Sequence, residues 1–263
     1  MGNSKSRLLV NKLCAASSIL NPIVLQTSKR YSLPYLWRTL PSIVFSHDHK
    51  FVYFRIPKAA NTSILYYLYQ LTSDCPEEFV KWDRSRITRN HFNSAGGMSI
   101  FKGRKALKKY FFFTFSRNPY NRILSCFIEK FRIASYQKRY ARLNISRERT
   151  AGDFVKFLRF LSKNGLYKDH HWIPQSDFIW PYKERLNFIG SVERLDDDLA
   201  ELSRLLGLGK KCAGFSRPPG GPPKTNASRK HERYYGDHPY GREARQLVYL
   251  LYKNDFTMFN YKK

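Results

Sequence analysis

Three short apolar runs, each followed by a loop and a stretch of helical spacing, constrain the fold of this chain most strongly. Residues 51–56 read FVYFRI, residues 110–115 read YFFFTF and residues 187–192 read NFIGSV. Each run has the length and the aromatic and β-branched content of a buried strand. Strands that alternate with helices form a parallel sheet with helices on its faces. We therefore predict an α/β fold with a central parallel sheet flanked by helices.

The segments after these runs are predicted to be helical. Residues 61–71 place apolar side chains at the spacing of a helix, and a second helix is predicted from Tyr120 to about residue 140. Pro119 suits the first turn of that helix. Acidic residues at 196–198 favour a further helix N-terminus, and residues 242–259 return to helical spacing.

Length and composition predict one globular domain. The chain has 263 residues, of which 42% are hydrophobic, enough to bury one sizeable core. We assign residues 41–263 to this domain and residues 1–40 to a basic, poorly ordered N-terminal arm. Residues 214–230 carry many Gly and Pro residues, so a loop is predicted there. No apolar stretch of the arm has the ~20 residues that a membrane span needs.

The charge predicts anionic partners without naming one. The chain has 47 Lys and Arg against 20 Asp and Glu, a net charge of +27. Such a field concentrates nucleic acid, anionic membrane surfaces and phosphorylated or sulfated ligands alike. The four cysteines are far apart and form no metal-binding pattern, so a reduced, cytoplasmic location and no structural metal are predicted.

The loop between the first strand and the first helix is a candidate anion site. A helix N-terminus offers unpaired backbone N–H groups and the positive end of a dipole. The loop lacks the G-x-x-x-x-G-K-[ST] pattern of nucleoside triphosphatases, which disfavours a standard P-loop. Its residues are Pro57, Lys58, Ala59, Ala60, Asn61, Thr62 and Ser63.

A second candidate anion site follows the second strand. Arg117 ends that strand, and Ser125 lies two helical turns into the next helix. A guanidinium fork and a hydroxyl on one helix face suit a phosphate group. Two such sites about 60 residues apart suit a ligand with two separate anionic ends.

These two segments resemble the nucleotide motifs of the sulfotransferases, most closely the branch with bacterial enzymes and Golgi carbohydrate sulfotransferases. Residues 55–63, RIPKAANTS, resemble the 5′-phosphosulfate loop, and residues 115–127, FSRNPYNRILSCF, resemble the 3′-phosphate motif. Three later segments resemble segments of members of this branch, namely residues 171–175, 189–195 and 252–261. The resemblance implies a P-loop-like three-layer fold, 3′-phosphoadenosine 5′-phosphosulfate (PAPS) as co-substrate without a metal, and a hydroxylated acceptor. A carbohydrate acceptor is favoured, and the basic surface suits an anionic one.

The resemblance also implies residue roles. Residues 57–63 hold the 5′ end of the donor, Arg117 and Ser125 hold its 3′-phosphate, and Lys58 stabilises the charge that develops during transfer. A general base must accept the proton of the acceptor hydroxyl. His91 is the first candidate, because it lies between the two motifs as in some relatives, and His171 is the second. Glu193 is a third candidate, although a structural role as a helix-start carboxylate is favoured for it. Asn61 departs from the family, which often has Gly there.

Two other functions fit parts of the sequence. A nucleic-acid-binding protein would use the positive charge and the aromatic residues as phosphate contacts and stacking platforms. Many aromatics lie inside strand-like runs such as residues 110–115, which favours a core role for them, so no specific nucleic acid is expected. The chain could also be a P-loop kinase, but the missing G-x-x-x-x-G-K-[ST] pattern weakens this interpretation.

Overall fold

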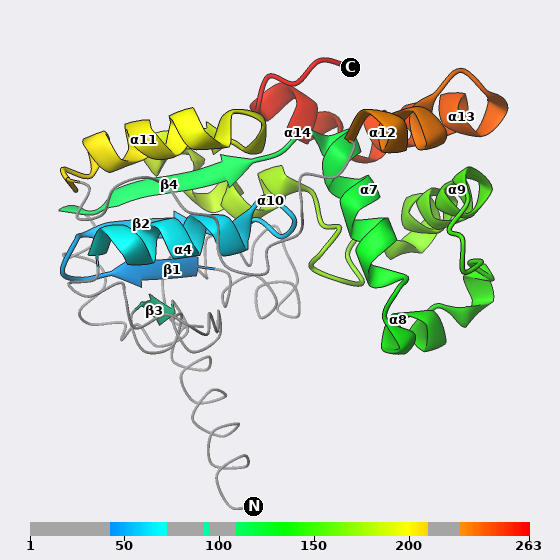
Figure 1. Ribbon diagram of the computed structural model, residues 1–263, viewed down its shortest axis with the longest axis horizontal. Coiled ribbons are helices and arrows are strands. Elements are labelled where there is room, and N and C mark those ends of the chain that lie inside the picture. The colour runs from blue at the N-terminus through cyan, green and yellow to red at the C-terminus, as the bar shows by residue number, and fades with distance from the viewer. Residues whose placement is uncertain (1–42, 73–91, 95–108, 210–226) are drawn as a thin grey trace, which may run out of the picture. The chain divides into compact units, whose positions relative to one another are not determined.

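The computed structural model describes residues 43–72, 92–94, 109–209 and 227–263 (Figure 1). These residues form two compact units. The sheet unit contains the described residues of Met1–Ile56, Ala60–Phe115 and Phe178–Pro219. The helical unit contains Pro57–Ala59, Ser116–Asp177 and the described residues of Gly220–Lys263. No helix among the described residues is both long and apolar enough to cross a membrane.

The sheet is mixed rather than parallel. It has five strands in the order β3-β1-β2-β4-β5. Strand β1 pairs antiparallel with β2 and with β3, whereas β2 pairs parallel with β4. The strands are β1 (Ile43–Ser46), β2 (Phe51–Phe54), β3 (Asn93–Ser94), β4 (Phe111–Ser116) and β5 (Phe188–Ser191). The α/β class and the three predicted strands are confirmed, and the prediction of a parallel sheet is wrong.

A short turn explains the mixed sheet. Only residues 47–50 separate β1 from β2. A parallel pair needs a crossover of about a dozen residues or more. A connection as short as this one therefore forms an antiparallel hairpin. Lys50 takes a positive φ of 50° in this turn.

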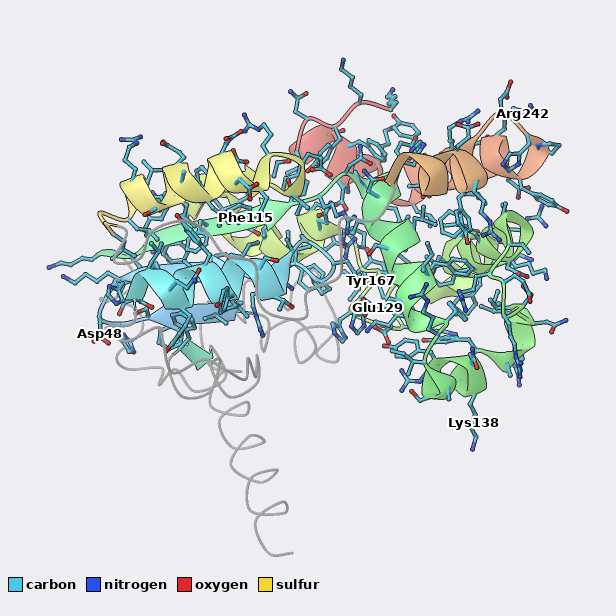
Figure 2. All side chains as sticks on the ribbon, in the orientation of Figure 1. Asp48, Phe115, Glu129, Lys138, Tyr167 and Arg242 are labelled. Atoms are coloured by element: carbon cyan, nitrogen blue, oxygen red, sulfur yellow. The ribbon has the colours of Figure 1, made fainter. Side chains whose placement is uncertain are left out.

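Two helices cover one face of the sheet. The apolar sides of α4 (Asn61–Thr72) and α11 (Leu195–Leu205) share a core with side chains of β1, β2 and β4. The rings of Tyr53 and Phe113 stack with centroids 5.0 Å apart. Phe115 belongs to the same core, in which Figure 2 labels it. The short helix η8 (Val192–Arg194) leads from β5 into α11.

The opposite face of the sheet is also buried. Phe112 lies on it, with the guanidinium group of Arg185 4.5 Å from the centre of its ring. Arg185 ends the 3₁₀ helix η7 (Trp180–Arg185). The aromatic side chains of the second predicted strand are therefore buried on both faces of the sheet. This confirms that they belong to the core and do not form a stacking surface.

The helical unit is built around aromatic side chains. Phe127 packs within 5.6 Å of three other Phe rings, measured between centroids. Trp172 is fully buried and donates from Nε1 to the carbonyl of Gly165 at 2.9 Å. The helices of this unit are α7 (Pro119–Lys130), α8 (Ala134–Arg139), η5 (Ala141–Leu143), α9 (Ala151–Phe160), the π-helical η6 (Leu161–Gly165), α12 (Ala227–Tyr235), α13 (Pro239–Leu251) and α14 (Lys253–Met258). Helix α10 (Gln175–Ile179) begins in this unit.

Three predicted segments differ from the structure. The helix predicted from Tyr120 to about residue 140 is split into α7 and α8, and the one over residues 242–259 into α13 and α14. A buried aromatic residue follows the first helix of each pair, Phe131 in one and Tyr252 in the other. The loop predicted over residues 214–230 ends earlier, because α12 begins at Ala227, and its remainder lies outside the described residues.

Candidate functional site

The loop after β2 has an unusual backbone. Lys58 and Ala60 have positive φ angles of 69° and 52°, in the left-handed region that non-glycine residues rarely occupy. Left-handed residues in a tight turn direct successive backbone N–H groups to one side, a concavity that binds anions. Asn61 does not share this conformation. It begins α4, and its Oδ1 accepts a hydrogen bond from the Tyr53 hydroxyl at 3.1 Å.

The predicted donor loop is divided between the two units. Pro57, Lys58 and Ala59 belong to the helical unit, and Ala60 through Ser63 belong to the sheet unit. Thr62 and Ser63 lie in the first turn of α4 and are half-buried. The strand, loop and helix order of this segment is confirmed.

Arg117 is held at its backbone and reaches the donor loop with its side chain. Its N–H donates to Gln175 Oε1 at 2.9 Å, and its carbonyl accepts from Gln175 Nε2 at 2.8 Å. Its Nη1 donates to the carbonyl of Lys58 at 3.1 Å. The two segments that were identified separately in the sequence are therefore in direct contact within the helical unit.

Arg122 is a site residue that the sequence interpretation missed. It is buried on α7, where Nε donates to the carbonyl of Pro57 at 3.0 Å. Nη2 donates to the carbonyls of Ile173 at 2.7 Å and His171 at 3.3 Å. A buried charge needs such partners because desolvation is costly. The available signal was a second Arg three residues before Ser125, on the same helix face.

Helix α7 presents one face to the donor loop. Its N-cap is Asn118, which accepts from Tyr120 N, and Pro119 occupies the first turn as predicted. Ser125 is half-buried on α7, three residues after Arg122 and four before Glu129. Because residues at this spacing share a face, Ser125 lies on the face that contacts the loop.

The ammonium group of Lys58 is paired with Glu129. Lys58 Nζ donates to Glu129 Oε2, and Lys130 Nζ lies 3.3 Å from Glu129 Oε1. Partial burial by itself would raise the pKa of Glu129, but the hydrogen bonds and charges of Lys58 and Lys130 together outweigh it and hold the pKa below its usual range. The site therefore contains a carboxylate held between two ammonium groups.

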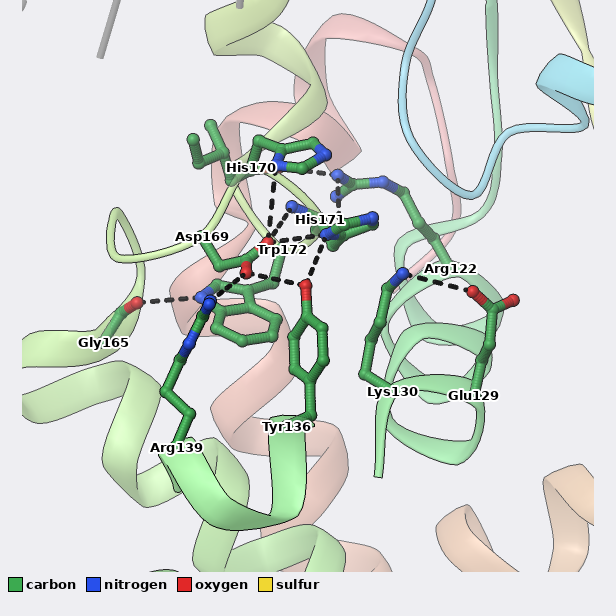
Figure 3. A network of polar contacts seen from close by, with 11 residues as sticks. Arg122, Glu129, Lys130, Tyr136, Arg139, Gly165, Asp169, His170, His171 and Trp172 are labelled. Atoms are coloured by element: carbon green, nitrogen blue, oxygen red, sulfur yellow. Dashed lines mark hydrogen bonds and ion pairs between the residues drawn. The ribbon is translucent and has the colours of Figure 1, made fainter. Parts of the chain in front are cut away.

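His171 lies in a network of polar contacts (Figure 3). Its Nδ1 lies 2.6 Å from Asp169 Oδ1 and 3.2 Å from the Tyr136 hydroxyl, which donates to Asp169 Oδ2 at 2.8 Å. Burial opposes ionisation of Asp169, but the hydrogen bonds from His171 and Tyr136 hold its pKa well below the usual range. A carboxylate that accepts from Nδ1 leaves Nε2 as the basic nitrogen of a neutral ring.

Within the part of the chain that the structure describes, one group of His and carboxylate side chains is close enough to hold a metal ion. It consists of Asp169, His170 and His171, whose potential ligand atoms lie within 4.8 Å of one another. Such atoms can bind a divalent metal. The Asp169 carboxylate also accepts hydrogen bonds from His171 and Tyr136.

Two further candidates for the general base are His91 and Glu193. His91 is outside the described residues, so its role as general base stays a prediction. Glu193 belongs to the sheet unit, where its backbone N–H donates to Ser191 Oγ and its carboxylate accepts from the same hydroxyl at 2.8 Å. This contact, at the start of η8, is the arrangement of a helix-start carboxylate.

Comparison with known proteins decides the family. The sequence profile of the sulfotransferase family matches residues 41–262. The chain belongs to the sulfotransferase family. It is an enzyme of the sulfotransferase type. The nucleic-acid-binding and kinase interpretations are displaced by this membership.

The sulfotransferase resembles several curated carbohydrate sulfotransferases. It is 27% identical to carbohydrate sulfotransferase 12 of Mus musculus over 296 residues, which span 99% of this chain and 68% of the relative. It is also 27% identical to carbohydrate sulfotransferase 11 of Rattus norvegicus, over 84% of this chain and 67% of the relative. A shorter match, 37% over 106 residues, joins 36% of the chain to 28% of carbohydrate sulfotransferase 14 of Mus musculus. No solved structure matches the chain.

These relatives overturn the predicted cytoplasmic location, because they belong to the Golgi branch of carbohydrate sulfotransferases. The prediction relied on the separated cysteines. A domain of this size has a large core and needs no disulfide in any compartment, so the cysteine pattern did not report location. Cys126, the free cysteine among the described residues, is buried, and burial raises the pKa of its thiol to about 12.

Proposed function

We propose that this sulfotransferase moves a sulfuryl group from PAPS to a hydroxyl of a carbohydrate. The names of its relatives support a carbohydrate acceptor. The family and the two nucleotide motifs support the PAPS donor. We also propose that the α/β fold is the P-loop-like three-layer arrangement that the resemblance implies.

The observation that carries the proposal is the contact between the two motifs. Arg117 donates to the carbonyl of Lys58, and Arg122 donates to the carbonyl of Pro57. A donor with one anionic group at each end needs its two anion sites at a constant separation. These two hydrogen bonds hold the loop that receives the 5′ end against the segment that receives the 3′-phosphate.

The residues around the donor would act by position and charge. In sulfuryl transfer, as in phosphoryl transfer, the acceptor and leaving oxygens are in line and charge collects on the bridging oxygen. The Lys58 ammonium group would stabilise that charge. The backbone N–H groups and hydroxyls at residues 60–63 would hold the 5′ end, while Arg117 and Ser125 hold the 3′-phosphate. No metal is part of this proposal.

The general base would be a histidine. His91 is the first candidate and His171 the second. Asp169 supports His171, because a carboxylate at Nδ1 orients the ring and stabilises the imidazolium that forms after Nε2 takes a proton. The base accepts the proton of the acceptor hydroxyl as the oxygen attacks sulfur, and the bond from sulfur to the bridging oxygen breaks.

Calorimetry with adenosine 3′,5′-bisphosphate, the desulfated donor, tests the donor assignment. The enzyme should bind this nucleotide with higher affinity than ATP or a DNA oligomer at the same ionic strength. Binding of either competitor without binding of the bisphosphate would refute the assignment.

An acceptor screen with labelled donor tests the second substrate. Neutral and acidic oligosaccharides should both be offered, and the position of the label located by mass spectrometry. The net charge of +27 favours the acidic ones. The same charge supports contact with an anionic membrane surface, which sedimentation with anionic vesicles tests. Transfer only to lipid or small-metabolite acceptors would exclude a carbohydrate substrate.

A further inference from the structure

Glu129 is a carboxylate in a site that is expected to bind a strongly anionic nucleotide. It projects from α7, and Figure 2 labels it there. It accepts a hydrogen bond from Lys58, the residue assigned to charge stabilisation, and it also pairs with Lys130. All three residues lie in the helical unit. The proposed transfer reaction uses no carboxylate at this place, so Glu129 needs another explanation.

Two side chains of α7 hold the donor loop in different ways. Arg122 holds the backbone of Pro57, and Glu129, seven residues later and on the same helix face, holds the side chain of Lys58. Arg122 is buried, whereas the Glu129 side chain is 51% exposed. The Arg122 contact is therefore shielded from solvent, whereas the Glu129 carboxylate is accessible to solvent and its partner Lys58 is 15% exposed.

We propose that Glu129 is a positioning residue that holds the Lys58 ammonium group before the donor binds and releases it when the donor binds. The proposal rests on the proposed function, because the anion that displaces Glu129 is the 5′ end of the donor. Lys130 completes the exchange. Its ammonium group already lies 3.3 Å from Glu129, so the carboxylate stays paired after Lys58 has left.

This exchange makes Glu129 a competitor of the donor. Breaking the ion pair between Lys58 and Glu129 costs free energy, which offsets part of the attraction between Lys58 and the donor. Removal of the carboxylate should therefore increase the affinity for the donor, and the gain should appear in the KM for PAPS rather than in kcat. A residue with a merely structural role would lower stability or kcat instead.

The test is a calorimetric titration of the full chain with adenosine 3′,5′-bisphosphate. Glu129→Gln should bind the nucleotide about two- to fivefold more tightly than the parent protein, the effect of one exposed ion pair. Glu129→Asp keeps the charge but shortens the side chain by one methylene, so it should also bind more tightly. If Asp behaves as the parent and only Gln tightens binding, the charge acts at a distance and the contact with Lys58 is irrelevant.

A double-mutant cycle ties the effect to Lys58. In a Lys58→Met background, Glu129→Gln should leave the nucleotide affinity unchanged, because the pair is already broken. Glu148→Gln removes the same charge from an exposed position of the same unit and should have no effect in either background. Tightening that persists in Lys58→Met, or that Glu148→Gln reproduces, would overturn the proposal.

Other outcomes separate this inference from the proposed function. If no variant and not even the parent protein binds the bisphosphate, the donor assignment itself fails. If the parent binds and Glu129→Gln binds equally or less tightly, only the exchange fails. Loss of transfer with unchanged affinity would assign Glu129 to the chemical step or to a structural role, and either result contradicts the proposed exchange.

Discussion

The two units bury different kinds of side chains. The core of the sheet unit consists mainly of aromatic and aliphatic side chains. Apart from tyrosines, Asp198 is the buried ionisable side chain in the described part of this unit. The helical unit buries several charged side chains in addition to its aromatic core: Arg122, Lys130, Asp153, Asp169, Asp177 and Asp255. Burial of charge costs free energy unless the charge is paired, and buried charge concentrates at functional sites. The sheet unit is thus mainly a scaffold, and the helical unit carries most of the described polar chemistry.

Substitution of the general base should have the largest effect on the rate, and it tests which of the two units supplies this group. Loss of a general base lowers the transfer rate by about 10²- to 10⁴-fold. His91→Ala should show this loss and retain the affinity for adenosine 3′,5′-bisphosphate, whereas His171→Ala should retain most transfer. Rates with radiolabelled donor and calorimetry measure the two quantities. The reverse result would move the base into the helical unit and strengthen the contrast between the units.

Lys58 and Arg117 test whether two residues of the helical unit act on different ends of the donor. Lys58→Ala should lower kcat by about 10²- to 10³-fold, as expected for a group that stabilises charge in the transition state. Arg117→Ala should mainly weaken binding of the bisphosphate. Steady-state kinetics and calorimetry on both variants separate the roles. Full turnover by Lys58→Ala would contradict the assignment.

Phe113 tests the scaffold role of the sheet unit. It is fully buried and packs against Phe51, Tyr53 and Phe115. Phe113→Ala should lower the free energy of unfolding by about 3–5 kcal/mol, and Phe113→Leu by less. Urea denaturation measures both. A loss below about 1 kcal/mol would show that this core is loosely packed.

Asp153 tests whether buried charge in the helical unit stabilises it. Its carboxylate accepts hydrogen bonds from Ser146, Thr150 and Lys156, and these overcome the opposing effect of burial and lower its pKa to about 2. A depressed pKa gives stability that is present above the unfolded-state value of 3.8 and is lost as the pH falls through about 2.

The substitution Asp153→Asn should therefore lower the Tm at neutral pH by a few degrees. The difference from the parent protein should shrink as the pH falls from about 4 to about 2. Thermal unfolding followed by circular dichroism between these pH values measures it. Glu148→Gln, at an exposed carboxylate of the same unit, is the control. An unchanged difference over the whole range would assign the effect of Asp153 to shape rather than charge.

Much of the local structure was predictable because it depends on neighbouring residues. The three strands followed from short apolar runs, and the start of α4 followed from apolar spacing after the loop. Pro119 marked the first turn of α7. The loop at residues 57–63 and the segment around Arg117 were recognisable because each follows a strand. Local periodicity and turn chemistry are visible in a sequence without knowledge of the fold.

The helix breaks were not predictable from the same signals. Apolar spacing continues through Phe131 and Tyr252, yet a helix ends before each of them. The Tyr252 hydroxyl donates to the carbonyl of Trp172 at 2.7 Å, and Phe131 packs on Phe157. Contacts with residues distant in sequence thus outweigh helix continuation, and local spacing contains no record of them.

By itself the sequence determined the α/β class, the positions of three strands and the two segments that place this chain among the sulfotransferases. The tertiary structure decided the antiparallel pairing of β1, the burial of Arg122 between three carbonyls and the pairing of Lys58 with Glu129. The physical reason is the distance along the chain over which each property is determined. Strand propensity and motif spacing are properties of adjacent residues, whereas the partner of a charged side chain is known only after the chain has folded.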